Sequence, residues 1–371
     1  MAKSCCNKAC IVQGEKYRFS VLTPFMMRME YSETGVFEDL QTQTVLNREF
    51  PVPEYSVTQS DDRLEIETEA FHMIYDKKKF SEEGLFIDVK YDFTNYGGRW
   101  YFGAKTYSFP PREHNLKGTM RTLDRADGEV ELEYGLMDKS GRTFFDDSKS
   151  FVFDEENMPS KRKHEEIDVY YLAYGRDYFA CLRDFYKLSG AVPLLPRYAL
   201  GNWCRYWKYS EESYIELLTE FEKRNIPFSV AVMDMDWHIV DVPMESGGGW
   251  TGYTWNNDLF PNPERFLSWL HEHNYHVTLN VHPASGIRNF EKMYKDMAEY
   301  LGINPDSKKT IEFDMTNKEL VEAYFKFVHH PHENAGVDFW WIDWQQGNNG
   351  GASGIDPLWM LNYFHFKDME K

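Results

Sequence analysis

The sequence contains no apolar run of the roughly 20 residues that a membrane-spanning helix requires. Its first segment, Met1–Gly14, is polar and lacks the apolar core of a signal peptide. We therefore expect a cytoplasmic protein that has no membrane as a partner.

Positive charge is also scarce. Lysine and arginine together number 41 against 60 acidic residues, which gives a formal net charge of −19 at pH 7. No long basic cluster interrupts this balance, which argues against nucleic acid and anionic membrane surfaces as partners. A neutral small molecule is compatible with the charge, and the 17% of aromatic residues suits flat amphipathic ligands as well as a core.

Cysteine is sparse and odd in number, with five residues, so a disulfide framework is not expected. The spacing of Cys5, Cys6 and Cys10 matches no usual zinc pattern, and a loose N-terminus with reduced thiols is the simpler interpretation.

The histidine groups do not predict a metal site either. His271 and His273 are two residues apart and point in different directions on a helix. His329, His330 and His332 lie near the end of a predicted helix, where the helix dipole favours histidine. The sequence thus predicts no metal and no other cofactor.

Residues 1–165 show short alternating strands separated by turn residues, which is typical of a β-sandwich. Asp154–Glu166 is polar and reads as a linker or long loop. A helix is predicted over Asp177–Ser189 and ends at Gly190. Residues 166–195 are therefore predicted to form a helical connection to a second domain.

The pattern changes after Pro196, where strands and helices alternate, as they do in parallel sheets covered by helices. Ser210 and Asn262 are predicted to cap helices, the second with Pro263 in its first turn. A capping box at Thr316 and Glu319 is predicted to open another helix. The predicted strands are Tyr198–Cys204, Phe228–Met233, Tyr275–Val281 and Val337–Ile342.

Two parallel architectures fit this alternation. A doubly wound open sheet is one, but no glycine-rich phosphate loop follows any strand. A (β/α)8 barrel is the other; it needs eight strand–helix units and about 250 residues, and the four units of residues 196–371 make about half of one. We predict a β-sandwich followed by the first half of a TIM barrel, in a chain that is truncated.

Polar residues follow three of the four predicted strands: Asp234 and Asp236, then His282, then Asp343. Strand ends of this kind meet on the catalytic face of a barrel, so Asp234 and Asp343 are expected to face one cavity from neighbouring strands. Carboxylates beside tryptophan rings suit a sugar site, and two carboxylates are what glycoside hydrolysis requires. The tryptophans in question are Trp203, Trp207, Trp237, Trp341 and Trp344.

Several short motifs, in this order and spacing, resemble glycoside hydrolase family 31, best known for α-glucosidases. They are Phe37–Asp39, Gly118–Asp124, Pro196–Gly201, Met233–Trp237, Tyr253–Trp255 with Phe260–Pro261, Phe313–Asn317, and Trp341–Asp343.

The resemblance implies a retaining mechanism with Asp343 as nucleophile. It places Asp234 and Trp341 in the subsite that holds the terminal sugar. Trp203, Trp344 and His282 are further candidates for substrate binding. The family's acid/base aspartate follows the nucleophile on a later strand, so this resemblance places it beyond Lys371.

The chain departs from the family pattern in two places near the expected sugar. Trp344-Gln345-Gln346 stands where Met-Asn-Glu is common, and Lys308–Glu312 lacks a tryptophan often found there. The substrate is thus expected to be an oligosaccharide or other α-glycoside. An α-glucosidase is favoured, with α-xylosidase, α-galactosidase or transglycosylase as alternatives. A non-catalytic carbohydrate-binding protein, a barrel aldolase or isomerase, and a homo-oligomer also stay open.

Overall fold

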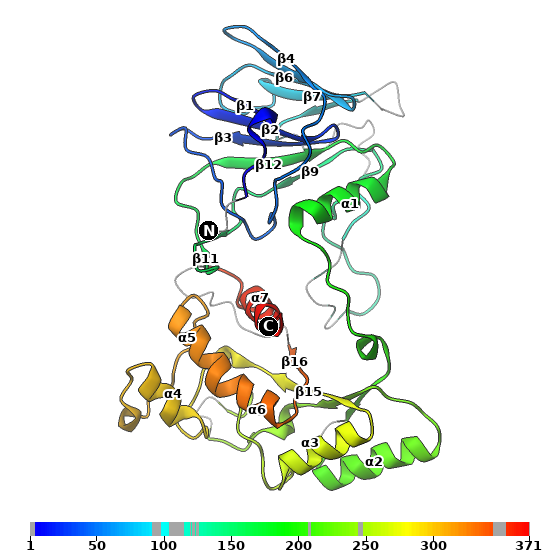
Figure 1. The fold of residues 1–371 in the computed structure, drawn as a ribbon, viewed down its shortest axis with the longest axis vertical. Coiled ribbons are helices and arrows are strands. Elements are labelled where there is room, and N and C mark those ends of the chain that lie inside the picture. Colours follow the sequence, from blue (N-terminus) through cyan, green and yellow to red (C-terminus); the bar gives the residue numbers. More distant parts are fainter. Residues whose placement is uncertain are drawn as a thin grey trace. The chain divides into compact units, whose positions relative to one another are not determined.

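The structure is a computed structural model in which the chain divides into two compact units, Met1–Val192 and Pro193–Lys371. Each unit is described by itself (Figure 1). The described residues are 4–90, 98–103, 115–118, 120, 123, 126–206, 209–243, 248–343 and 354–370.

The first unit contains two antiparallel five-stranded sheets. One has the order β1 (Ile11–Gln13), β2 (Tyr17–Thr23), β3 (Met26–Tyr31), β12 (Ile167–Leu172) and β9 (Thr143–Asp146). The other runs in sequence order: β4 (Ser56–Gln59), β5 (Leu64–Glu67), β6 (Phe71–Tyr75), β7 (Leu85–Val89) and β8 (Arg99–Tyr101). A short pair, β10 (Val152–Phe153) and β11 (Pro159–Ser160), completes the strands of this unit that the structure describes.

Alternate side chains of these strands form one apolar core between the two sheets. Phe19, Met29 and Tyr171 from the first sheet share a buried cluster with Ile66 and Met73 from the second. Because side chains alternate across a strand, the residues between them lie on the opposite face. This arrangement explains why the predicted strands of residues 1–165 read as alternating patterns.

The opposite face of the first sheet carries a buried ion network. Arg28 donates from Nε and Nη2 to the two carboxylate oxygens of Asp168 at 2.8 and 2.7 Å. Arg18 binds Glu30 in the same two-pronged way, and Arg162 also reaches Asp168 at 2.9 Å. Burial opposes ionisation of Asp168, but the charges of Arg28 and Arg162 outweigh it and hold the pKa of Asp168 below its usual range.

Strand β12 corrects the predicted helical connection over residues 166–195. This strand lies between β3 and β9 and belongs to the first sheet, while helix α1 (Tyr178–Ser189) follows it within the same unit. Helix α1 itself confirms the prediction, since Asp177 caps its start through the Ala180 N–H and Gly190 ends it. The prediction missed β12 because this strand follows a polar stretch and itself contains a charged residue, Asp168. In the structure Asp168 is buried and paired with Arg28.

The second unit is built on a parallel four-stranded sheet in the order β13 (Trp203–Tyr206), β14 (Val230–Met233), β15 (His276–Val281) and β16 (Phe339–Ile342). Helices lie in each connection. They include α2 (Glu211–Lys223), α3 (Pro263–Glu272), α4 (Tyr294–Tyr300), α5 (Lys318–Ala323) and α6 (His330–Ala335), with α7 (Pro357–Met369) after the last strand.

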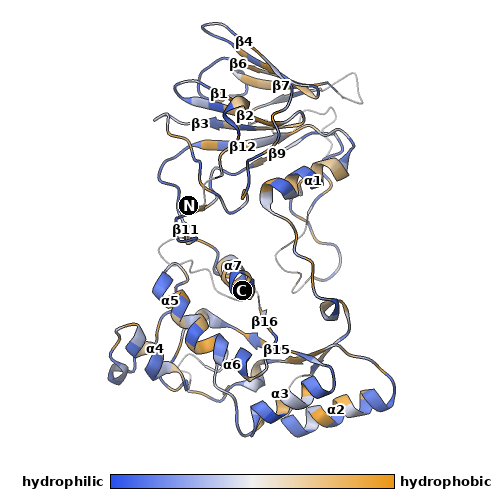
Figure 2. Ribbon diagram, viewed as in Figure 1, coloured by the Kyte–Doolittle hydropathy of each residue, from blue (hydrophilic) through white to orange (hydrophobic). Residues whose placement is uncertain are grey.

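Local sequence signals account for most of these helices. Ser210 forms a capping box with Ser213 at the start of α2, and the apolar Tyr214 and Leu218 of that helix are buried. The ribbon of α2 accordingly carries both hydropathy colours (Figure 2). Asn262 caps α3 with Pro263 in its first turn, as predicted. Among the helices that the structure describes, none combines the length and apolarity needed to cross a membrane.

The predicted cap of α5 and the predicted start of the first parallel strand were wrong. The residue that caps α5 is Asn317 and not Thr316, whose hydroxyl instead donates to Asp314 at 2.6 Å. The first parallel strand begins at Trp203, because the 3-10 turn η2 (Arg197–Leu200) occupies the start of the predicted strand.

The two faces of the parallel sheet carry different kinds of side chain. Cys204, Met233 and Leu279 belong to the apolar cluster that α2 and α3 cover, together with Val281 and Ile342. By alternation the other face carries the intervening residues, which are Arg205, Val232, Thr278, Asn280 and Trp341. Arg205, Thr278 and Asn280 are the polar residues of this face. The residues at the carboxyl ends of the strands come next in the sequence.

His238 is the basis of a stability prediction. Its ring is fully buried, its Nδ1 lies 3.1 Å from the Ile239 carbonyl oxygen, and Nε2 has no partner among the described residues. Burial lowers its pKa from 6.5 to about 4, helped by His282 and Arg288 and opposed by Asp234. Because the folded protein binds this proton less readily than the unfolded chain, stability falls as the pH drops from 6.5 toward 4.

The expected contribution of His238 between pH 6.5 and 4.5 is about 2 kcal/mol of unfolding free energy. Urea unfolding at both pH values measures it. His238→Gln should remove about this much of the pH dependence, whereas His164→Gln, at an exposed histidine, should leave it unchanged. Equal pH dependence in wild type and His238→Gln would show that His238 does not carry the effect.

Candidate functional site

Three polar residues follow directly after three neighbouring strands. Asp234 follows β14, His282 follows β15 and Asp343 follows β16. Because the strands are parallel and in this order, their carboxyl ends meet at one edge of the sheet. Strand β15 lies between the other two, so Asp234 and Asp343 do not sit on neighbouring strands as predicted, and His282 lies between them.

His282 lies close enough to Asp343 to hydrogen-bond with it, and the charges of both Asp343 and Asp234 act on its ring. Its Nε2 lies 3.3 Å from Asp343 Oδ2, and its side chain is only 2% exposed. Burial lowers the pKa of His282, against the opposing effects of the Asp343 hydrogen bond and of the Asp343 and Asp234 charges. A histidine that is neutral near pH 7 can donate from Nε2 to Asp343, which leaves Nδ1 as an acceptor.

That acceptor is buried, and it has no hydrogen-bond partner among the residues that the structure describes. Trp250 lies against the same ring with centroids 4.1 Å apart, and the residue as a whole is 41% exposed. The Thr251 hydroxyl donates to the His282 carbonyl and so fixes the backbone at this point.

Asp234 is held from two sides. Its Oδ2 accepts from Arg205 Nε at 2.9 Å and from Arg205 Nη2, and its Oδ1 accepts from the Met235 N–H at 2.8 Å. The guanidinium of Arg205 also lies over the Trp341 ring, with Cζ 5.9 Å from the centroid. Arg205 therefore connects the carboxylate that follows β14 to an aromatic ring on β16.

The structure brings most, but not all, of the predicted residues together. Asp234, His282, Asp343 and Trp341 gather at the carboxyl edge of the sheet through the contacts above. Trp203 does not join them, because it opens β13 at the opposite edge, where its ring contacts Phe339 at 5.4 Å. We therefore leave Trp203 out of the site.

None of the other three tryptophans predicted near a sugar is placed in the site by the described residues. Trp237 is buried in the helix-side core and donates from Nε1 to the Asn280 carbonyl at 2.8 Å, so it belongs to the core rather than to the site. Trp344 and Trp207 lie outside the described residues. The prediction that Trp344 binds substrate stays a prediction.

Sequence reasoning missed two residues of the site, Arg205 and Trp250. The predicted first strand ended at Cys204, so the charged Arg205 fell outside it, although an arginine at the end of an apolar strand is itself a signal. Trp250 lies in a connection, and nothing in its spacing pointed to the His282 ring.

The chemistry available at this edge is specific. Asp343 is 24% exposed, so its carboxylate can reach a ligand while His282 orients it. Asp234, held by Arg205, offers further oxygens to hydroxyl groups, and Trp341 and Trp250 offer ring faces. A partly exposed carboxylate, a second carboxylate and aromatic rings are together suited to holding a sugar.

Comparison with known proteins decides the family. The model of the glycosyl hydrolases family 31 TIM-barrel domain matches residues 192–363, which include the whole edge described above. Residues 192–363 therefore belong to the TIM-barrel domain of glycoside hydrolase family 31. The resemblance noted from the sequence motifs is thus confirmed.

Curated relatives resemble the chain at low identity. It is 26% identical to an α-xylosidase of Saccharolobus solfataricus over 52% of this chain and 25% of that protein. It is 24% identical to the glucosidase 2 subunit alpha of Schizosaccharomyces pombe over 69% of this chain and 30% of that protein. The chain thus spans between a quarter and a third of the length of these two relatives.

Solved structures of the family share the fold. A Flavobacterium johnsoniae dextranase of family 31, complexed with glucose, matches 89% of this chain and 45% of its own with a TM-score of 0.58 at 17% identity. A soil-metagenome α-xylosidase of family 31, complexed with xylose, matches 97% of this chain and 62% of its own with a TM-score of 0.57 at 14% identity. These likenesses concern the fold.

Proposed function

We propose that the chain is the nucleophile-bearing part of a retaining α-glycoside hydrolase, with Asp343 as the nucleophile. The observation that carries this proposal is the Asp343 carboxylate at the end of β16, hydrogen-bonded to the buried His282. Relatives named α-xylosidase and glucosidase support the reaction class.

In the proposed first step, an Asp343 oxygen attacks the anomeric carbon, and the bond from that carbon to the leaving-group oxygen breaks. A general acid supplies the proton that this oxygen takes up. In the second step a water attacks the same carbon, releases the Asp343 carboxylate and returns its proton to the acid. We assign the acid role to no residue of the chain, since the family resemblance places it on a later strand.

We also propose the architecture in which this chemistry occurs. The two sheets of the first unit, with their shared apolar core, are proposed to form a β-sandwich. The parallel sheet β13–β16, with a helix in each connection, is proposed to be the first half of a (β/α)8 barrel. The polar face that leads to Asp343 would then line the barrel interior.

The relatives named α-xylosidase and glucosidase make α-xylosides and α-glucosides the first substrates to test. The complete protein should be assayed with aryl α-glucoside, α-xyloside and α-galactoside, while proton NMR records the first anomer released. We expect turnover of one of the first two with release of the α-anomer. Initial release of the β-anomer would contradict a retaining mechanism, and sugar binding without turnover would favour the carbohydrate-binding alternative.

Arg205 is expected to act as a positioning residue for Asp234. Arg205→Met removes the two donors to Asp234 and the cation over Trp341. Hydrogen bonds to charged groups are worth about 1.5–3 kcal/mol, so kcat/KM should fall by about 10- to 100-fold. Arg205→Lys should restore part of this loss, because lysine keeps the charge but not the forked geometry.

Steady-state kinetics of the complete protein measure this effect. The matched control is Arg265→Met, which removes an exposed arginine that binds Glu211 in the same unit. A kcat/KM for Arg205→Met within two-fold of this control would remove Arg205 from the site.

A further inference from the structure

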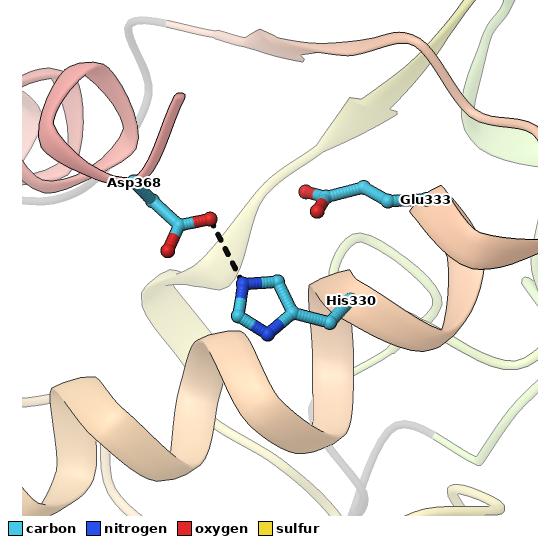
Figure 3. A group of neighbouring side chains, drawn as sticks. All are labelled: His330, Glu333 and Asp368. Carbon is cyan, nitrogen blue, oxygen red and sulfur yellow. Dashed lines mark hydrogen bonds and ion pairs between the residues drawn. The ribbon is translucent and has the colours of Figure 1, made fainter. Parts of the chain in front are cut away.

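A second cluster of chemically active side chains lies away from Asp343, between two helices. The helical run of α5, the π-helical turn η7 (Tyr324–His329) and α6 carries His330 and Glu333, which are one turn apart and share a face. Asp368 reaches them from α7, with its Oδ2 2.9 Å from His330 Nε2. Figure 3 shows the three side chains converging from the two helices.

The three groups have the geometry of a metal site. One ligand atom from each of His330, Glu333 and Asp368 lies within 4.8 Å of the others. Nitrogen and carboxylate ligands sit about 2.0–2.2 Å from Zn²⁺, which places them about 3.4 Å from one another in a tetrahedron. Small side-chain adjustments would therefore be enough to close the site around an ion.

The surroundings of the two carboxylates favour metal binding. Trp340 donates from Nε1 to Glu333 Oε1 at 2.8 Å, which fixes the Glu333 carboxylate and leaves its second oxygen available to an ion. Partners of this kind orient metal ligands in known sites. The Asp368 side chain is only 8% exposed, so an ion there would be partly shielded from water.

An independent observation comes from the histidines around the cluster. His365 lies one turn before Asp368 on α7, and its ring centroid is 4.6 Å from that of His329. Both His329 nitrogens and His365 Nε2 are buried with no hydrogen-bond partner in the part of the chain that the structure describes. Buried polar atoms without partners are rare, and binding of an ion or a water is one of the explanations for them.

We propose that His330, Glu333 and Asp368 bind a divalent transition-metal ion, with Zn²⁺ the best match. An imidazole nitrogen with two carboxylate oxygens favours Zn²⁺ over Ca²⁺ or Mg²⁺, which prefer oxygen ligands alone. A fourth position would hold water. The ion would tie α7 to α6 on the helical side of β16. This proposal is independent of the proposed glycosidase activity. It also departs from the sequence analysis, in which the spacing of the histidines predicted no metal site.

Without an ion, the same residues form a histidine–aspartate pair and a tryptophan–glutamate hydrogen bond. Titration of the untagged, chelator-treated protein with ZnCl₂ by calorimetry separates the two cases, with CaCl₂ as the second arm. We expect saturable Zn²⁺ binding at one ion per chain and no comparable Ca²⁺ binding. His330→Ala and Asp368→Asn should each weaken Zn²⁺ binding by about 100-fold.

His273→Ala is the matched control, since His273 is an exposed histidine that also contacts a carboxylate, Glu222. It should bind Zn²⁺ like wild type. Co²⁺ provides a second measurement on wild type, because a tetrahedral site gives a strong visible absorption band that His330→Ala should abolish. Absence of Zn²⁺ binding, or binding that His330→Ala and Asp368→Asn leave unchanged, would overturn the proposal.

Discussion

Replacement of Asp343 by asparagine in the complete protein should lower kcat for an aryl α-glycoside by about 10⁴-fold or more, the scale seen when a catalytic nucleophile or its partner is lost. An amide fills nearly the same volume but cannot supply the anionic nucleophile. The fold should persist, since the carboxylate is partly exposed. Asp306→Asn, at an exposed aspartate, is the matched control and should keep wild-type activity.

Chemical rescue separates the nucleophile role from a general acid role. Asp343→Gly leaves space for azide, which can attack the anomeric carbon in place of the carboxylate. An activated α-glycoside should then give the β-glycosyl azide, with inverted configuration. Formation of the α-glycosyl azide would identify Asp343 as the acid/base residue, and wild-type activity in Asp343→Asn would exclude it from catalysis.

The largest effect expected on stability concerns Arg28 in the first unit. Arg28→Met leaves the buried Asp168 with Arg162 but without its two-pronged partner, and it leaves Glu30 without a contact at 3.1 Å. Removing one member of a buried ion pair costs about 3–5 kcal/mol. Amide hydrogen exchange of β3 and β12, followed by mass spectrometry, should show a loss of this size in the free energy of opening.

Arg63→Met is the control in the same unit. Arg63 is 54% exposed and pairs with Glu65 at 2.7 Å, and exposed pairs contribute about 0–1 kcal/mol. A loss for Arg28→Met no larger than that for Arg63→Met would show that the network is not a major source of stability.

Local signals in the sequence were sufficient for the central part of the site. Asp234, His282 and Asp343 each end an apolar strand, and side chains at the ends of parallel strands must meet at one edge. The capped helices α1, α2 and α3 followed in the same way, since the residues that cap them lie beside them in the sequence.

Features that depend on distant partners could not be predicted. Strand β12 read as part of a connection, because the Arg28 that neutralises Asp168 is 140 residues away in the sequence. The His330–Asp368 contact joins two residues that are 38 positions apart in the sequence, and histidine spacing alone carries no information about it. Trp203 was predicted near the end of its strand but lies at the start. The 3-10 turn η2 delays the start of the strand, and the pattern of apolar residues does not reveal this turn.

Covalent trapping of the sugar tests the central claim most directly. The complete protein should be incubated with the 5-fluoro-α-glycosyl fluoride of its preferred sugar, whose leaving group needs no proton and whose ester hydrolyses slowly. Peptide mass spectrometry should then find one added glycosyl group on the peptide that contains Asp343, and fragmentation should place it on that residue. Glycosylation of another carboxylate, such as Asp236 or Asp314, or turnover without any trapped ester, would contradict the assignment of Asp343 as the nucleophile.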